Sequence, residues 1–137
     1  MYINGQWVNA VSGATFSTHN PSNGEKIGEV ADGNQDDARQ AIESAHGAFE
    51  TWSGLTAYQR SEYLYRAYQF MMEQKEYLAR VMTEEQGKPL KASMGEVRYG
   101  ADFLLWYAEE AKRIYGETIP APRSDQRFIV LRHPAGV

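Results

Sequence analysis

The 137-residue sequence contains no cysteine. Disulfide bonds, thiolate metal sites and a cysteine nucleophile are therefore excluded within this chain. Its three histidines, His19, His46 and His133, lie too far apart in the sequence to indicate a zinc site, and surface or core roles are favoured for them. The absence of cysteine fits a reducing compartment, and we expect a cytoplasmic protein with no bound metal.

An excess of positive charge is also lacking. The formal net charge is −4, and the basic residues are scattered, which argues against nucleic acid as a partner. The longest apolar run, Phe103 to Ala108, is far shorter than the roughly 20 residues that span a bilayer. The first residues lack the charged-then-apolar layout of a signal peptide. We therefore expect no binding to nucleic acids or membranes.

Familiar site motifs are missing as well. The sequence has neither of the two common glycine-rich phosphate loops and no H-E-x-x-H metal motif. Three acidic pairs, Asp36-Asp37, Glu84-Glu85 and Glu109-Glu110, could in principle serve acid–base chemistry. Structural interpretations are stronger: the first pair suits the positive end of a helix dipole, and Glu109 has the spacing to pair with Arg113.

The first third of the chain has the features of short strands and turns. Asn4-Gly5, between two short apolar segments, is the favoured dipeptide of a tight β-hairpin. Residues 20–24 have turn chemistry, and residues 26–31 are suited to another short strand.

Four helices are expected in the middle. The first begins at Asn34, with Asp37 completing a capping pair, and ends at residues 53–54. Gly47 within it is explained either by a close neighbouring backbone or by harmless exposure. The second helix begins near Thr56, where Gln59 completes a capping pair of the same kind. The third is short and ends at Gly87.

The fourth helix is predicted over residues 89–116, about 40 Å long, with Pro89 in its first turn. Its apolar residues fall on two faces. The first face comprises Leu90, Met94, Val97, Ala101, Leu104, Ala108, Ala111 and Tyr115, and the second comprises Tyr99, Phe103 and Trp106. A small helical unit covers one such face readily, whereas covering two is harder.

The end of the sequence predicts an extended linker at 119–122 and then a strand at 128–131, which is continuous in apolar residues and should be buried on both faces. The only partners foreseen for this strand lie before residue 32, and an unpaired apolar edge is an aggregation liability. We therefore expect the natural chain to continue. The fold class is α+β and mostly α, with a hairpin, four helices and one final strand.

Eight short segments follow one another along the chain: Ile3-Asn4-Gly5-Gln6-Trp7-Val8, Ser12-Gly13-Ala14-Thr15-Phe16, Asn20-Pro21-Ser22-Asn23-Gly24-Glu25, Ala48-Phe49 with Trp52, Gln86-Gly87-Lys88-Pro89-Leu90, Tyr107-Ala108-Glu109-Glu110-Ala111, Gly116-Glu117-Thr118-Ile119-Pro120 and Pro134-Ala135-Gly136-Val137. In this order they resemble the N-terminal part of the NAD(P)-dependent aldehyde dehydrogenases. Residues 86–120 look most like the succinate-semialdehyde branch.

The resemblance implies a piece of the larger α/β fold of that family. Residues 1–122 would form an incomplete helical layer of the cofactor-binding domain, and residues 123–137 the first strand of the sheet used for homotetramer assembly. The family's nucleophile, base and cofactor motif follow the last segment, so no catalytic or cofactor-binding residue is assigned here. NAD or NADP would bind the longer protein and not this chain, whose main partner would be the remainder of its own polypeptide.

The resemblance also implies a location for the second face of the long helix. It would lie beside the substrate entrance, which makes Tyr99, Phe103 and Trp106 candidates for the tunnel wall; the alternative for these residues is ordinary packing against another domain. Some members hold a monovalent cation near a position matching Glu85, with carbonyl groups near Thr18 and His19, but this chain would lack the third ligand, and no metal site is assigned.

Two other functions remain open. The chain could be a stand-alone helical interaction module whose two-sided helix docks a partner. It could also be one half of a split enzyme, active only when a second chain supplies the rest.

Overall fold

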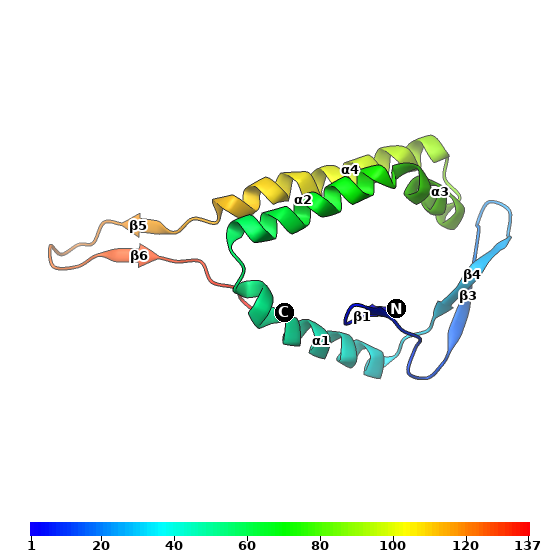
Figure 1. The fold of residues 1–137 in the computed structure, drawn as a ribbon, viewed down its shortest axis with the longest axis horizontal. Coiled ribbons are helices and arrows are strands. Elements are labelled where there is room, and N and C mark those ends of the chain that lie inside the picture. The colour runs from blue at the N-terminus through cyan, green and yellow to red at the C-terminus, as the bar shows by residue number, and fades with distance from the viewer.

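The computed structural model describes all residues, 1–137, and its elements form an open ring with a projecting tail (Figure 1). In chain order the elements are β1 (Tyr2–Ile3), β2 (Gln6–Trp7), β3 (Thr15–His19), β4 (Lys26–Ala31), α1 (Gln35–Ser53), α2 (Ala57–Glu73), α3 (Lys75–Gln86), α4 (Leu90–Glu110), the short 3₁₀ helix η1 (Ala111–Arg113), β5 (Glu117–Ile119) and β6 (Phe128–Val130).

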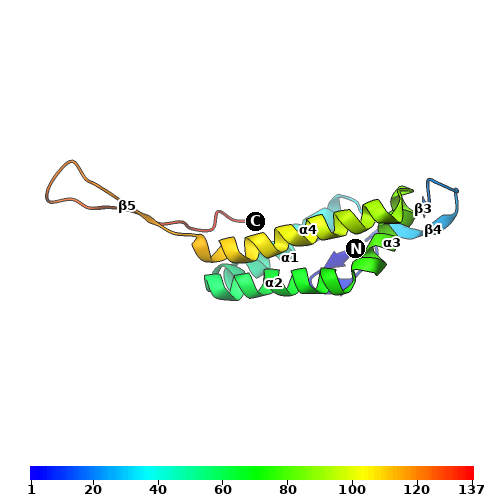
Figure 2. The same ribbon diagram turned by 90° about the horizontal axis from the view of Figure 1, so that it is seen from above.

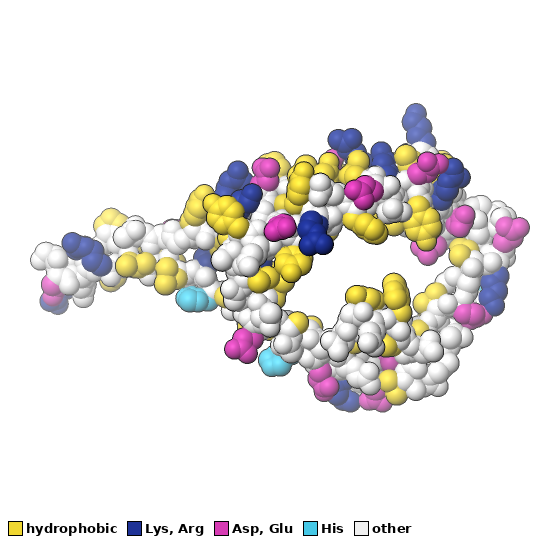
Figure 3. Space-filling view, in the orientation of Figure 1, with side chains coloured by type: hydrophobic (Ala, Val, Ile, Leu, Met, Phe, Trp, Pro, Cys, Tyr) yellow, Lys and Arg dark blue, Asp and Glu magenta, His cyan; other side chains and the backbone are white.

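The ring has four sides. Helix α1, with the β1–β2 hairpin, lies opposite the unit formed by α2, α3 and α4, and the β3–β4 hairpin closes one end (Figure 1). The β5–β6 hairpin projects from the other end as the tail, and the whole assembly is shallow when turned on its side (Figure 2). The space-filling view shows an opening through the centre, bordered by hydrophobic side chains (Figure 3).

Side-chain caps explain where the first two helices begin. The Asn34 side chain accepts hydrogen bonds from the backbone N–H groups of Asp36 and Asp37, and Asp37 accepts one from the Asn34 N–H. Thr56 and Gln59 make the same reciprocal pair at the start of α2. Both capping predictions are therefore confirmed. Such caps stabilise a helix because they satisfy the first amide groups, which no helical carbonyl can reach.

The buried residues are few, 8 of 137, so most apolar surface has no cover within this chain. Six of them lie in the three-helix unit, where α4 packs along α2 and against α3, and the other two, Ala10 and Asp37, lie together at the start of α1. The six are Ser61, Ala79, Ser93, Val97, Ala101 and Ala108. The molecule therefore has two separate packing centres on opposite sides of the ring.

Two joints connect these centres. At the closed end, Gly87 ends α3 with a left-handed backbone, φ +68°, and an added Cβ would stand 2.8 Å from Ser22 Oγ and 2.9 Å from Pro21 Cγ. At the other end, the rings of Trp52 and Tyr63 lie 5.4 Å apart across the α1–α2 elbow. The predicted stop at Gly87 is confirmed, and the structure adds the reason why no side chain is accommodated there.

The hairpins are antiparallel pairs. Asn4 and Gly5 both have positive φ, 51° and 75°, so the predicted tight turn is confirmed. The predicted strand at 26–31 is β4, and it pairs with β3, a strand that the sequence analysis did not identify.

The prediction for residues 128–131 is wrong in two respects. Strand β6 pairs with β5 (Glu117–Ile119), which overlaps the predicted linker at 119–122 only at Ile119, and not with any strand before residue 32. It is also exposed: Ile129 is 69% accessible and Leu131 65%. The continuous apolar run indicated burial on both faces, but only one short neighbouring strand lies beside it here.

Helix α4 is shorter than predicted. It runs from Leu90 to Glu110, about 32 Å, with Pro89 at the cap position, and the chain then tightens into η1. Tyr115 is therefore outside the helix and exposed, and Leu90 is also outside the buried face.

Gly47 in α1 has no atom within 4 Å of a built Cβ, which favours the harmless-exposure interpretation. No helix combines the length and the apolar character needed to cross a membrane.

Candidate functional site: the aromatic face of helix α4

Helix α4 has a buried face and, opposite it, an exposed aromatic face. Val97, Ala101 and Ala108 are at most 3% accessible and face α2 and α3. At about 100° per residue, Tyr99, Phe103 and Trp106 lie on the other side of the helix. The two-sided pattern predicted from the sequence is confirmed, and only one of the two sides is covered.

The aromatic face consists of Tyr99, Asp102, Phe103, Trp106 and Tyr107, which line a shallow groove of about 290 Å³. The Tyr99 and Phe103 rings meet edge to face, with centroids 4.9 Å apart and planes at 89°. Such contacts fix ring orientation and add to the stability of an aromatic pair. Trp106 and Tyr99 are each 66% accessible, so this is an open surface and not an enclosed cavity.

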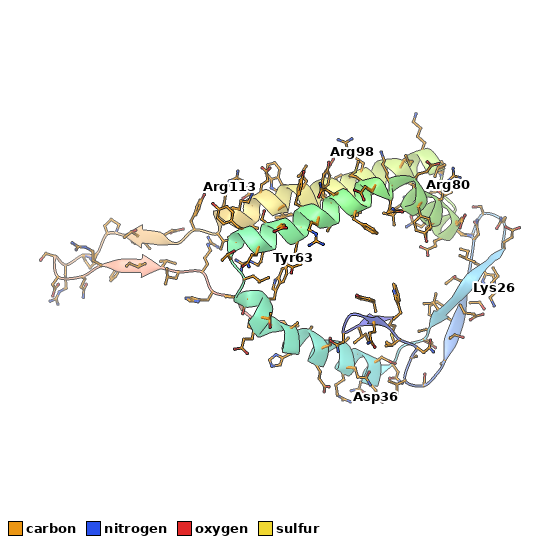
Figure 4. The ribbon with its side chains drawn as sticks, in the orientation of Figure 1. Lys26, Asp36, Tyr63, Arg80, Arg98 and Arg113 are labelled. Atoms are coloured by element: carbon orange, nitrogen blue, oxygen red, sulfur yellow. The ribbon has the colours of Figure 1, made fainter.

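One charged residue belongs to this groove, and the sequence analysis did not select it. Asp102 lies three residues after Tyr99, which places it on the flank of the aromatic face. Arg98, one turn earlier, donates from Nε to Asp102 Oδ2 at 3.5 Å. Arg98 projects from the outer side of α4, away from the central opening of the molecule (Figure 4). The spacing i, i+3 from the predicted aromatic residues would have identified Asp102.

A second and larger cleft, about 590 Å³, lies between α1 and residues 132–137. Its apolar wall comes from Phe49 and Trp52 of α1 and from Ile114, and Arg60 and Arg132 stand at its margin. Both arginines already donate to backbone carbonyl groups, of Leu55 and of Tyr115. This cleft brings together segments far apart in the sequence, and no local pattern indicated it.

The titratable groups with shifted pKa values have structural roles. The backbone N–H of Asn34, followed by that of Val11, donates to the buried Asp37 carboxylate and holds its pKa below the usual value. Hydrogen bonds from Lys26 and then Ser17 lower the pKa of Glu29 to about 2. Neither group lines the groove on α4 or the cleft beside α1, and both carboxylates are held by hydrogen bonds within the fold.

The acidic pairs behave largely as their structural interpretations predicted. Asp36 and Asp37 occupy the first turn of α1. The pairing of Glu109 with Arg113 is wrong, because Arg113 instead donates to Glu110 at 2.6 Å, an i, i+3 pair. Glu85 is exposed, and no group of three or more His, Asp or Glu side chains converges anywhere in the chain.

The N-termini of α1 and α2 are capped by side chains of this chain. A helix N-terminus attracts phosphate through free N–H groups, yet the first N–H groups of α1 and α2 already bond to Asn34 and Thr56. The glycines with positive φ lie in hairpin turns, in loops or at the end of α3, and none lies between a strand and a helix. No step through a nicotinamide cofactor is assigned to these residues.

The comparison with known proteins identifies the family. The family model described as "Aldehyde dehydrogenase family" matches residues 7–137, so the chain belongs to the aldehyde dehydrogenase family. The match is to the N-terminal region of these proteins, which confirms the resemblance drawn from the eight sequence segments.

Three relatives match nearly the whole chain. Glutarate-semialdehyde dehydrogenase of Pseudomonas putida is 49% identical over 99% of this chain and 28% of its own length. The NADP(+) succinate-semialdehyde dehydrogenase of Escherichia coli is 47% identical over 98% and 28%. The 3-sulfolactaldehyde dehydrogenase of Pseudomonas putida is 46% identical over 99% and 28%. The chain thus spans little more than a quarter of the length of the relatives it matches.

Solved structures agree. An NADP-dependent enzyme of E. coli superposes with a TM-score of 0.91 at 46% identity, covering 93% of this chain and 26% of that one. Succinate-semialdehyde dehydrogenase from Burkholderia pseudomallei gives 0.91 at 39% identity, covering 93% and 27%. The open ring is therefore the conformation that this segment takes within much longer proteins, which confirms the predicted fold class as part of the larger fold.

Proposed function

We propose that this chain serves as the N-terminal quarter of an NAD(P)-dependent aldehyde dehydrogenase whose substrate is a short aldehyde with an anionic group at its far end. The observation that carries the proposal is the similarity, at 46–49% identity over almost the full chain, to enzymes named for glutarate semialdehyde, succinate semialdehyde and 3-sulfolactaldehyde. Each of these aldehydes bears a carboxylate or a sulfonate.

The chain's own contribution would be architectural. Residues 1–122 would form the helical layer of the cofactor-binding domain, with the remainder of the polypeptide covering the apolar side chains that border the ring. Residues 123–137 would begin the assembly sheet of a homo-oligomer. The exposed apolar residues of β6, with Ile119 of β5, support this, since uncovered apolar surface marks an interaction site. The proposed boundary lies in the turn between those two strands.

The aromatic face of α4 would form part of the wall of the substrate entrance. Tyr99, Phe103 and Trp106 support the proposal because they form an exposed, rigid apolar surface next to a polar group, a combination typical of ligand sites. The chemistry itself would belong to residues outside this chain. A cytoplasmic location remains part of the proposal and rests on the sequence alone.

A chimaera tests the proposal. Residues 1–137 replace the matching N-terminal segment of the E. coli succinate-semialdehyde dehydrogenase, and NADPH formation from succinate semialdehyde is followed at 340 nm. We expect the chimaera to turn over. The E. coli remainder without an N-terminal segment, and the 137-residue chain alone, should produce no NADPH. Activity that returns when those two pieces are mixed would favour the split-enzyme alternative.

The role of the aromatic face is tested within the same chimaera. Tyr99→Ala and Phe103→Ala should raise KM for succinate semialdehyde several-fold, since each removes part of the proposed entrance wall. Tyr77→Ala is the matched control, because Tyr77 is 63% exposed on α3 and lies outside the groove. Equal effects of all three substitutions, or a folded chimaera with no activity, would contradict the proposal.

A further inference from the structure

The groove on α4 contains a carboxylate where an anionic substrate would be repelled. Asp102 stands among four aromatic side chains and is the only charged residue that lines this groove. Its side chain is about half accessible, so it faces whatever approaches the aromatic rings. An unpaired carboxylate at this position would disfavour an aldehyde that carries a negative group, through like-charge repulsion.

Arg98 cancels that charge. Its guanidinium Nε lies 3.5 Å from Asp102 Oδ2, one helical turn away, and no other cationic side chain pairs with Asp102. The arginine remains on the flank of the groove and does not line it. The pair is exposed, so its contribution to folding stability is small. Its effect on the electrostatic potential at the groove does not depend on that contribution.

We propose that the Arg98–Asp102 pair is a specificity determinant that makes the aromatic groove of α4 accept anionic aldehydes. This inference rests on the proposed function and deepens it by assigning charge selection to two residues of this chain. The aromatic rings contact the aldehyde's carbon chain, and the pair sets the charge that the anionic end meets. Arg98 acts through Asp102 and is a positioning residue.

The expected effect is moderate. Two like charges about 7 Å apart at a partly screened surface change an association constant about three- to tenfold. The effect should be confined to low ionic strength, because the Debye length falls to about 3 Å in 1 M salt. A neutral aldehyde of the same length, butanal, experiences no such repulsion.

The experiment measures kcat/KM for succinate semialdehyde and for butanal in the chimaera described above, at low and high salt. Arg98→Gln exposes the Asp102 charge, so the ratio of the two values should fall about three- to tenfold at low salt and recover in 1 M salt. Asp102→Asn should raise the ratio or leave it high, and the double variant should restore it to the level of Asp102→Asn.

Arg80→Gln is the matched control. Arg80 forms an equally exposed pair with Glu76 on α3, outside the groove, and its loss changes the net charge by the same amount. Circular dichroism checks that every variant remains folded. The inference is overturned if Arg98→Gln moves the ratio no more than Arg80→Gln, or if the double variant fails to restore it.

The two proposals fail in distinguishable ways. If the unmodified chimaera oxidises succinate semialdehyde but the ratio does not respond to Arg98→Gln, the charge assignment is wrong and the proposed function stands. If the unmodified chimaera is folded and oxidises neither aldehyde, both proposals fall together.

Discussion

Replacing Gly87 by alanine tests the joint between the three-helix unit and the β3–β4 hairpin. Gly87 has φ +68°, where an L-residue is strained by about 1 kcal/mol. The new Cβ would also stand 2.8 Å from Ser22 Oγ and 2.9 Å from Pro21 Cγ, closer than a Cβ atom normally approaches any non-bonded heavy atom. Overpacking of this kind costs about 1–2 kcal/mol, so we expect a total loss of about 2–3 kcal/mol.

A double-mutant cycle separates the two contributions. Pro21→Ala/Ser22→Ala removes the two side-chain atoms nearest to the Cβ, leaves the Ser22 backbone N at 3.3 Å, and does not change the backbone of Gly87. In that background Gly87→Ala should cost little more than the strain of about 1 kcal/mol, so the coupling energy should be about 1–2 kcal/mol. Urea unfolding followed by circular dichroism at 222 nm, with linear extrapolation, gives the four free energies of unfolding.

The cycle has a clear negative outcome. If Gly87→Ala costs the same in both backgrounds, the α3–α4 turn does not touch Pro21 and Ser22 in solution, and the ring is open at that end. If it costs nothing in either background, Gly87 does not adopt the left-handed conformation and the assigned end of α3 is wrong.

Three further predictions concern the helices. Thr56→Ala removes the acceptor for the Gln59 N–H and should lower the free energy of unfolding by about 1 kcal/mol in urea titrations, whereas Thr56→Ser should retain most of it. Val97→Ala removes buried methyl groups and should cost about 2 kcal/mol, against little for Val130→Ala on the exposed strand, by the same assay. The lowered pKa of Asp37 means that its contribution to stability is present above the unfolded pKa, about 3.9, and is lost as the pH falls toward the folded value. Protection of the Val11 amide from hydrogen exchange should therefore weaken in acid, and Asp37→Asn should remove that pH dependence; an unaltered profile in the variant would contradict the assignment.

The helical part of this fold could be predicted from sequence because its signals are local. Asn34 with Asp37, and Thr56 with Gln59, lie within one turn of the bonds they form, and Gly87 determines its own backbone conformation. The two faces of α4 follow from spacing alone. Helix ends were less certain: η1 replaces the last turn predicted for α4, since 3₁₀ and α turns share the same residues.

The parts that were missed depend on distant segments. Glu117-Thr118-Ile119 has no alternating pattern of its own and becomes a strand only because β6 lies beside it. The same holds for the Trp52–Tyr63 contact at the elbow, which joins two helices. Asp102 was missed for another reason: the second face of α4 was defined by its apolar residues alone, although the helical period places this carboxylate on the same surface.

The two separate packing centres determine how far local unfolding extends through this molecule. A destabilising change near Ala10 and Asp37 can affect the three-helix unit through the elbow, through the Gly87 turn or through residues 132–137 beside α1, since no side chain of this chain fills the centre of the ring. Local melting on one side can therefore leave the other side intact, and each urea transition above reports the half of the molecule that carries the substitution. A body that filled the ring would bring both halves into one cooperative unit.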